Sequence, residues 1–147
     1  MGDGPVSAPP HNLDSEMAVL GGVLLRNEAL NHVSALLSPE DFYLPAHQEI
    51  YRAMQNLADR RAPIDPITIE AELQGSGTLG MLGMLGGLVY LADVLARVPT
   101  AENIEYYARH VRDDSTRRRL SALGAAIPAR AQDRSHVVEE VLAEVEQ

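Results

Sequence analysis

Apolar residues recur at helical spacing along almost the whole chain, and this periodicity is the strongest constraint on the fold. Near the start, Leu13, Met17, Leu20 and Leu24 follow one another at intervals of three and four residues. Such intervals place all four side chains on one face of an α-helix. No segment alternates apolar and polar residues over a useful length, as a half-buried strand would. The sequence therefore predicts an all-α fold.

Residues that start and stop helices divide the chain into three parts. Residues 1–10 are small and rich in Gly and Pro, which predicts a disordered N-terminal arm. Residues 11–98 are expected to form a globular multi-helix head, and residues 99–147 a C-terminal αα-hairpin. Helices are expected from residue 14, over 28–37, 45–61, 66–73 and 88–98, and from residue 101 to a bend or end marked by Gly124 and Pro128. We also expect a loop over 75–80, a turn over 129–134 and a last helix capped by Ser135.

Two adjacent glycines, Gly21 and Gly22, lie inside the first predicted helix. Each costs roughly 1 kcal/mol relative to Ala in a helix interior. A glycine pair at such a position indicates that another element comes close to the helix backbone. We therefore expect a neighbouring helix to approach the chain there.

Composition and charge exclude several kinds of function. The 147 residues include no Cys, which excludes disulfides, thiolate nucleophiles and Cys-type zinc sites. All basic residues are Arg, so a Walker-type phosphate loop, which needs Lys, is excluded as well. The formal charge of −9 predicts repulsion from nucleic acid and from anionic membranes. There is no secretion signal and no membrane-length apolar run, so we expect a cytoplasmic protein that binds neither DNA nor membrane directly.

Few residues suggest a catalytic, metal-binding or nucleic-acid-binding site. His47 and Glu49 form the first half of a deaminase-like zinc motif, but the Cys pair that completes the motif is missing. A packed or capping histidine explains His47 better. The one basic run is Arg117–Arg119, which is either an exposed helix face partly neutralised by nearby aspartates or a surface that meets an acidic partner. Direct DNA contact by this run is a minor alternative because the surrounding charge is negative.

The last predicted helix is too short and too rich in Val to be stable by itself in water. Its apolar stripe needs a cover, and one helix of the hairpin can cover only part of it. We expect another chain to cover the remainder.

Taken together, the chain resembles the N-terminal domain of the bacterial replicative hexameric DNA helicase, the DnaB family. The resemblance runs from about Pro9 to the end, although the tandem triplet over residues 80–85 adds three residues before Gly86. Five blocks in the family's order and spacing carry it: Pro9-Pro10-His11 with Glu16 and Val19-Leu20-Gly21; Asp41-Phe42-Tyr43 with His47, Ile50, Tyr51 and Met54; Pro63-Ile64-Asp65 with Ile67-Thr68; Gly86-Gly87 with Tyr90-Leu91; and Pro99-Thr100-Ala101 with Asn103-Ile104, Tyr107-Ala108 and Val111-Arg112.

The resemblance implies a non-catalytic domain of a cytoplasmic protein at the replication fork. In the family, this domain precedes a linker and a RecA-like motor that holds ATP and Mg²⁺, and the motor is absent here. We therefore expect a fragment or isolated domain with no catalytic residue, metal or cofactor. Six such domains form a collar, often as a trimer of dimers. The collar receives the C-terminal domain of primase, and a helicase loader is a further candidate partner.

Family positions also suggest which residues make these contacts. Tyr90, Leu120 and Ile127 are expected at the primase interface. The oligomer interface is expected to contain Ile104, Tyr107, Val111, Val138, Val141, Leu142 and Val145. Two alternatives remain: a stand-alone helical adaptor, such as a loader or a primase-side domain on a related scaffold, and a small all-α enzyme.

Overall fold

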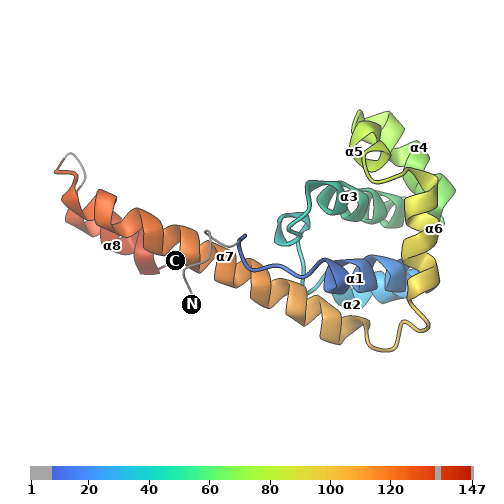
Figure 1. The fold of residues 1–147 in the computed structure, drawn as a ribbon, viewed down its shortest axis with the longest axis horizontal. Coiled ribbons are helices and arrows are strands. Elements are labelled where there is room, and N and C mark those ends of the chain that lie inside the picture. The colour runs from blue at the N-terminus through green and yellow to red at the C-terminus, as the bar shows by residue number, and fades with distance from the viewer. Residues whose placement is uncertain (1–7, 135–136, 147) are drawn as a thin grey trace. The chain divides into compact units, whose positions relative to one another are not determined.

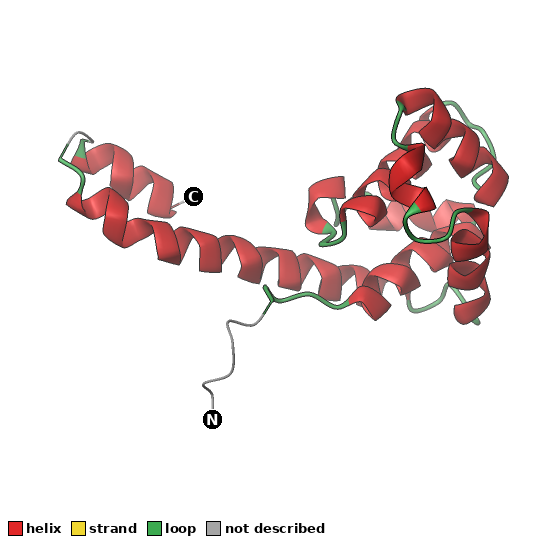
Figure 2. Ribbon diagram, turned by 45° about the horizontal axis from the view of Figure 1, so that its top comes forward, coloured by secondary structure: helices red, strands yellow, loops and turns green. Residues whose placement is uncertain are grey.

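All regular secondary structure in the described part of the chain is helical (Figure 1). The computed structural model describes residues 8–134 and 137–146, and Figure 2 shows only helices and loops among them. The all-α prediction is confirmed, and none of the helices described is long and apolar enough to cross a membrane. The helices are α1 (Leu13–Leu25), α2 (Leu30–Val33), α3 (Pro45–Asp59), α4 (Pro66–Ser76), α5 (Leu79–Gly83), α6 (Leu88–Arg97), α7 (Ile104–Gln132) and α8 (Val138–Glu146), with 3-10 turns at Asn27–Ala29 and Pro39–Asp41.

The chain divides into two compact units, and the division falls inside α7. The larger unit is His11–Ser115, and the smaller unit contains the described residues before His11 together with those from Thr116 onward. The first turns of α7 thus belong to the larger unit, although the sequence assigned the whole helix to the hairpin. Residues 1–7 of the predicted arm and the predicted cap Ser135 lie outside the described residues.

The larger unit has one continuous apolar core. α1 packs most extensively against α6, and α3 packs against α4. Aliphatic side chains dominate the core, as expected for a sequence with a single Phe and no Trp. Its fully buried members include Val19, Leu20, Ile50, Tyr51, Met54, Ile69 and Leu91.

The glycine pair of α1 lies where the sequence predicted a close approach. A Cβ on Gly21 would lie 2.5 Å from Val98 Cγ2 and 2.8 Å from the backbone oxygen of Val94. A Cβ on Gly22 would lie 2.7 Å from Ile104 Cδ1. Both glycines are buried, so their missing side chains let α6 and the start of α7 approach the α1 backbone. The prediction is confirmed.

Side-chain caps define two of the helix starts, and the start expected at residue 66 is confirmed. Asp65 accepts a hydrogen bond from the Thr68 backbone N–H at 2.8 Å, and Pro66 takes the first helical position of α4. The side chain of Asn12 caps α1 by accepting from the Ser15 N–H at 3.0 Å. These contacts satisfy backbone donors that have no partner inside the helix.

Other predicted boundaries were wrong, and tertiary packing explains most of the differences. The helix expected over 28–37 is a 3-10 turn followed by the single turn α2. α4 continues to Ser76 and ends at Gly77 in the left-handed conformation, with φ of +79°. α5 occupies part of the expected 75–80 loop because Leu82 is buried in the core. α7 begins at Ile104 and runs through Pro128 to Gln132, so the turn expected over 129–134 is largely helix.

Candidate interaction surface

The smaller unit contains a helical hairpin with an apolar hollow between its two arms. α8 folds back beside the C-terminal end of α7 (Figure 1). The hollow has a volume of about 460 Å³. Apolar side chains from both arms line it, together with two arginines and an aspartate: Ile127, Arg130, Ala131, Asp133 and Arg134 from the first arm and the turn, and Val138, Val141, Leu142 and Val145 from α8.

None of the residues described in α8 is buried. Val138 is 67% exposed, Leu142 54% and Val145 40%, while Val141 is half-buried. An ion pair between Arg130 and Glu144, at 2.5 Å, links the two arms of the hairpin. A nine-residue helix is marginal in water unless an apolar face is covered. The hairpin therefore presents a helix whose apolar face is only partly covered within its own chain.

The residues expected at the oligomer interface divide into two groups. Val138, Val141, Leu142 and Val145 all line the hollow on α8. Ile104 and Val111 are buried in the core of the larger unit, and Tyr107 packs against that core. The side chains of Ile104 and Val111 are thus already covered by their own chain. Sequence periodicity could not show this, because a helical stripe looks the same whichever chain covers it.

The three residues expected at the primase interface lie in different units. Leu120 is 62% exposed, and Ile127 is half-buried and lines the hollow; both lie on α7 in the smaller unit. Tyr90 lies on α6 in the larger unit and is half-buried. Ile127 therefore lines the same hollow as the α8 stripe, whereas Leu120 is exposed outside it.

Tyr90 is held by a buried polar network that the sequence did not predict. His47 is fully buried; its Nδ1 lies 2.8 Å from Glu16 Oε1, and its Nε2 lies 2.5 Å from the Tyr90 hydroxyl. Because a carboxylate only accepts, Nδ1 carries the proton that points to Glu16. Glu16 also accepts from the Tyr43 backbone N–H at 2.6 Å. The packed-histidine interpretation of His47 is thus confirmed.

The network joins α1, α3 and α6 and affects Tyr90 electrostatically. Burial raises the pKa of the Tyr90 hydroxyl, and the negative charge of Glu16 raises it further. Besides its place in the first family block, the sequence signal for Glu16 was its position one turn before Val19 and Leu20, which places it on the buried face of α1. Nothing in the sequence joins residues 31 and 43 positions apart into one network.

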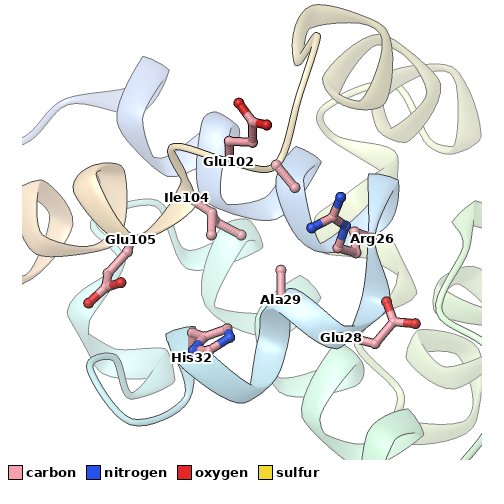
Figure 3. A pocket seen from close by; sticks show the side chains of 8 residues that line it. Arg26, Glu28, Ala29, His32, Glu102, Ile104 and Glu105 are labelled. Atoms are coloured by element: carbon pink, nitrogen blue, oxygen red, sulfur yellow. The ribbon is translucent and has the colours of Figure 1, made fainter.

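A second hollow, of about 310 Å³, lies in the larger unit (Figure 3). Ala29 and Ile104 form its apolar part, and charged side chains surround it. The Glu105 carboxylate accepts from Arg109 at 2.7 Å, and this bond lowers the pKa of Glu105. No group of three or more metal-ligating residues that could hold an ion occurs among the residues described. The polar lining residues of this hollow are Arg26, Glu28, His32, Glu102 and Glu105.

The arginine run lies on the exposed part of α7. Arg118 donates to the backbone oxygen of Pro10 at 2.7 Å, and Arg119 donates to the Thr116 hydroxyl at 3.3 Å. Arg117 is exposed and makes no ion pair with the residues described in the smaller unit. The run therefore keeps most of its positive charge on the surface.

Comparison with known proteins places this arrangement in a family. The profile of the family described as "DnaB-like helicase N terminal domain" matches residues 8–113. The chain is 43% identical over 138 residues to the replicative DNA helicase DnaC of Bacillus subtilis, covering 94% of this chain but 30% of that relative. The chain thus spans about a third of the length of the curated relatives it matches.

Solved structures agree with the sequence comparison. The N-terminal domain of DnaB helicase from Mycobacterium tuberculosis is 38% identical and has a TM-score of 0.83, covering 95% of this chain and 96% of that one. The N-terminal domain of DnaB helicase from Helicobacter pylori, described with its interactions with primase, is 25% identical with a TM-score of 0.68, covering 82% of this chain and 91% of that one.

Proposed function

Because the chain belongs to the family of DnaB-like helicase N-terminal domains, we propose that it joins subunits of a replicative DNA helicase and receives primase. The observation that carries the proposal is the hairpin of the smaller unit, in which no described residue of α8 is buried. A helix with polar side chains on every face would need no second chain to cover it. The apolar stripe of α8 supports a role in holding chains together.

Self-association is assigned to the hollow side of the hairpin. Val138, Val141, Leu142 and Val145 would be covered by a second copy, since they are exposed or half-buried in one chain. In a complete helicase, six copies would form a collar built as a trimer of dimers. Ile104 and Val111 would support that collar indirectly, by packing the start of α7 onto the larger unit.

Primase would bind near Leu120 and Ile127 of the hairpin and near Tyr90 of the larger unit. Two points support this part of the proposal: Leu120 is exposed, and a 25% identical structure is described with its interactions with primase. The complete protein would hold ATP and Mg²⁺ in a separate motor domain and act in the bacterial cytoplasm. A helicase loader would be a further partner, and this acidic domain would not bind DNA or membranes itself.

Sedimentation equilibrium of the chain, wild type against Val141→Asp, tests self-association. A carboxylate at position 141 would have to lose its water when two copies meet, so association should weaken by about tenfold or more. Val137→Asp is the matched control, because Val137 is exposed and does not line the hollow. Equal association of wild type and Val141→Asp would contradict the proposal.

The same sedimentation experiment with the C-terminal domain of primase added tests docking. Wild-type chain should co-sediment with it, and Leu120→Asp should reduce the bound fraction while leaving the fold unchanged by circular dichroism. No binding by the wild type would remove primase from the proposal and leave self-association to be judged on the first measurement.

A further inference from the structure

The tandem triplet over residues 80–85 plays no part in the proposed function. Gly80-Met81-Leu82 and Gly83-Met84-Leu85 repeat the same three residues in the same order. The first triplet lies within α5, and the second begins at the last residue of that helix. Met81 and Met84 therefore have the same immediate chain neighbours, and a difference between their surroundings comes from the fold.

The core uses the first triplet and leaves the methionine of the second in solvent. Leu82 is 1% exposed, whereas Met81 is half-buried and Met84 is 87% exposed. The backbone oxygen of Leu82 accepts from the N–H groups of Leu85 and Gly87 at 3.0 Å each. Leu82 thus anchors the turn after α5, and the side chain of Met84 is not needed to hold it.

The chain around Met84 leaves space for small molecules to reach its sulfur. A Cβ added to Gly83, the residue before it, would meet no atom within 4 Å. Residues 73–92 contain no charged residue, and their exposed large apolar side chains are Met84, Leu88 and Val89. Of these three, only Met84 carries a sulfur that a mild oxidant attacks.

The other methionines in the described part of the chain are better protected. Met54 is fully buried in the core, and Met17 is partly buried against it. An oxygen on either sulfur would place a polar S=O group in apolar surroundings, which costs free energy unless the group finds a hydrogen bond. An oxygen on the sulfur of Met84 would stay in water. Met84 is therefore the methionine best placed to be oxidised while the larger unit stays folded.

We propose that Met84 is a site of reversible oxidation by peroxides, which convert its thioether to methionine sulfoxide. A sulfur lone pair attacks the hydroxyl oxygen of the peroxide, so that an S–O bond forms as the O–O bond breaks. The proton of the attacked oxygen moves to the departing oxygen, which leaves as water or as an alcohol. Sulfur gives up two electrons and the peroxide gains them. Enzymes that reduce methionine sulfoxide reverse the change: a dithiol supplies two electrons and becomes a disulfide, and the oxygen leaves as water.

Oxidation would change the surface of the larger unit without changing its core. The sulfoxide replaces the most exposed of the three large apolar side chains in the uncharged stretch 73–92 by a polar one. Leu82 would still anchor the turn, because its contacts do not involve the sulfur of Met84. The second triplet thus gives the unit a surface whose polarity responds to peroxide. The inference does not depend on the proposed function, because no residue of the hairpin takes part.

Hydrogen peroxide added to the folded chain, followed by peptide mass spectrometry, tests the site. Met84 should be oxidised at least about tenfold faster than Met54, and also faster than Met81, its counterpart in the repeat. The same treatment in concentrated urea is the control, because all methionines are then exposed and their rates should converge. Met84→Leu should remove the fast phase of oxidation, whereas Met81→Leu should keep it.

Stability and reversal provide two further readouts. A chain oxidised only at Met84 should melt at the same temperature as the untreated chain by circular dichroism. Methionine sulfoxide reductase with a dithiol should restore the original mass without unfolding the chain. Similar oxidation rates for Met84 and Met54 in the folded chain would overturn the proposal. So would a fall in melting temperature on oxidation of Met84 alone, or a sulfoxide at Met84 that the reductase leaves unchanged.

Discussion

Replacing Gly21 by Ala should destabilise the larger unit, although Ala is the better helix former. The new Cβ would lie 2.5 Å from Val98 Cγ2 and 2.8 Å from the Val94 backbone oxygen. Carbon atoms in favourable contact lie about 3.5–4.0 Å apart, so both neighbours must move by roughly 1 Å. The half-buried Val98 side chain has room to rotate, but the Val94 oxygen belongs to α6 and moves only with the helix.

The magnitude follows from two opposing terms. Overpacking of this kind costs about 1–3 kcal/mol and more where backbone must shift, while Gly to Ala in a helix interior gains about 1 kcal/mol. Because α1 and α6 form the most extensive helix contact of the unit, we expect the upper end of the first range. The net loss should be about 2 kcal/mol, or a melting temperature lower by roughly 6–10 °C.

Gly75→Ala provides the control. Gly75 lies in α4, and a Cβ there would meet nothing within 4 Å, so this variant should match or exceed the wild type in stability. Urea unfolding followed by circular dichroism compares all three proteins. A Gly21→Ala variant as stable as Gly75→Ala would show that the helix-approach reasoning is wrong.

Two further predictions concern the buried network. Glu16→Ala should lower the free energy of unfolding by roughly 3 kcal/mol, because the Tyr43 N–H and His47 Nδ1 would lose a buried acceptor; an unchanged urea midpoint would contradict this. The raised pKa of Tyr90 stabilises the fold fully below the unfolded value of about 10, and this contribution is lost as pH rises toward the folded value. Between about pH 9 and pH 11, the free energy of unfolding measured in urea should therefore fall less for Tyr90→Phe than for wild type. An equal fall in both proteins would argue against a role for Tyr90.

Features with a local cause are the ones that the sequence predicts best. The cap at Asp65 depends on residues within one turn, and its signal lies in the order of the residues themselves. The glycine pair was informative for a related reason, since its helix cost had to be offset by something nearby in space. The predicted all-α fold rested on the same short-range periodicity.

Contacts between residues far apart in the sequence could not be predicted from local patterns. Ile104 and Val111 form a helical stripe that could serve a second chain or the chain's own core, and only the structure shows that the core covers them. Glu16, His47 and Tyr90 come from three helices, and no local pattern marks them as partners. The helix predicted over 28–37 gave way to a turn and α2, where Ala29, Leu30 and Val33 are buried in the core.

Amide hydrogen exchange of α8, measured over a range of chain concentrations, tests most directly whether the hairpin is completed by another chain. We expect slow exchange at high concentration, when a second copy covers Val138 and Leu142, and exchange near the rate of an unstructured peptide after dilution. Strong protection of α8 that does not change with concentration would mean that one chain stabilises the helix alone, and would contradict the account.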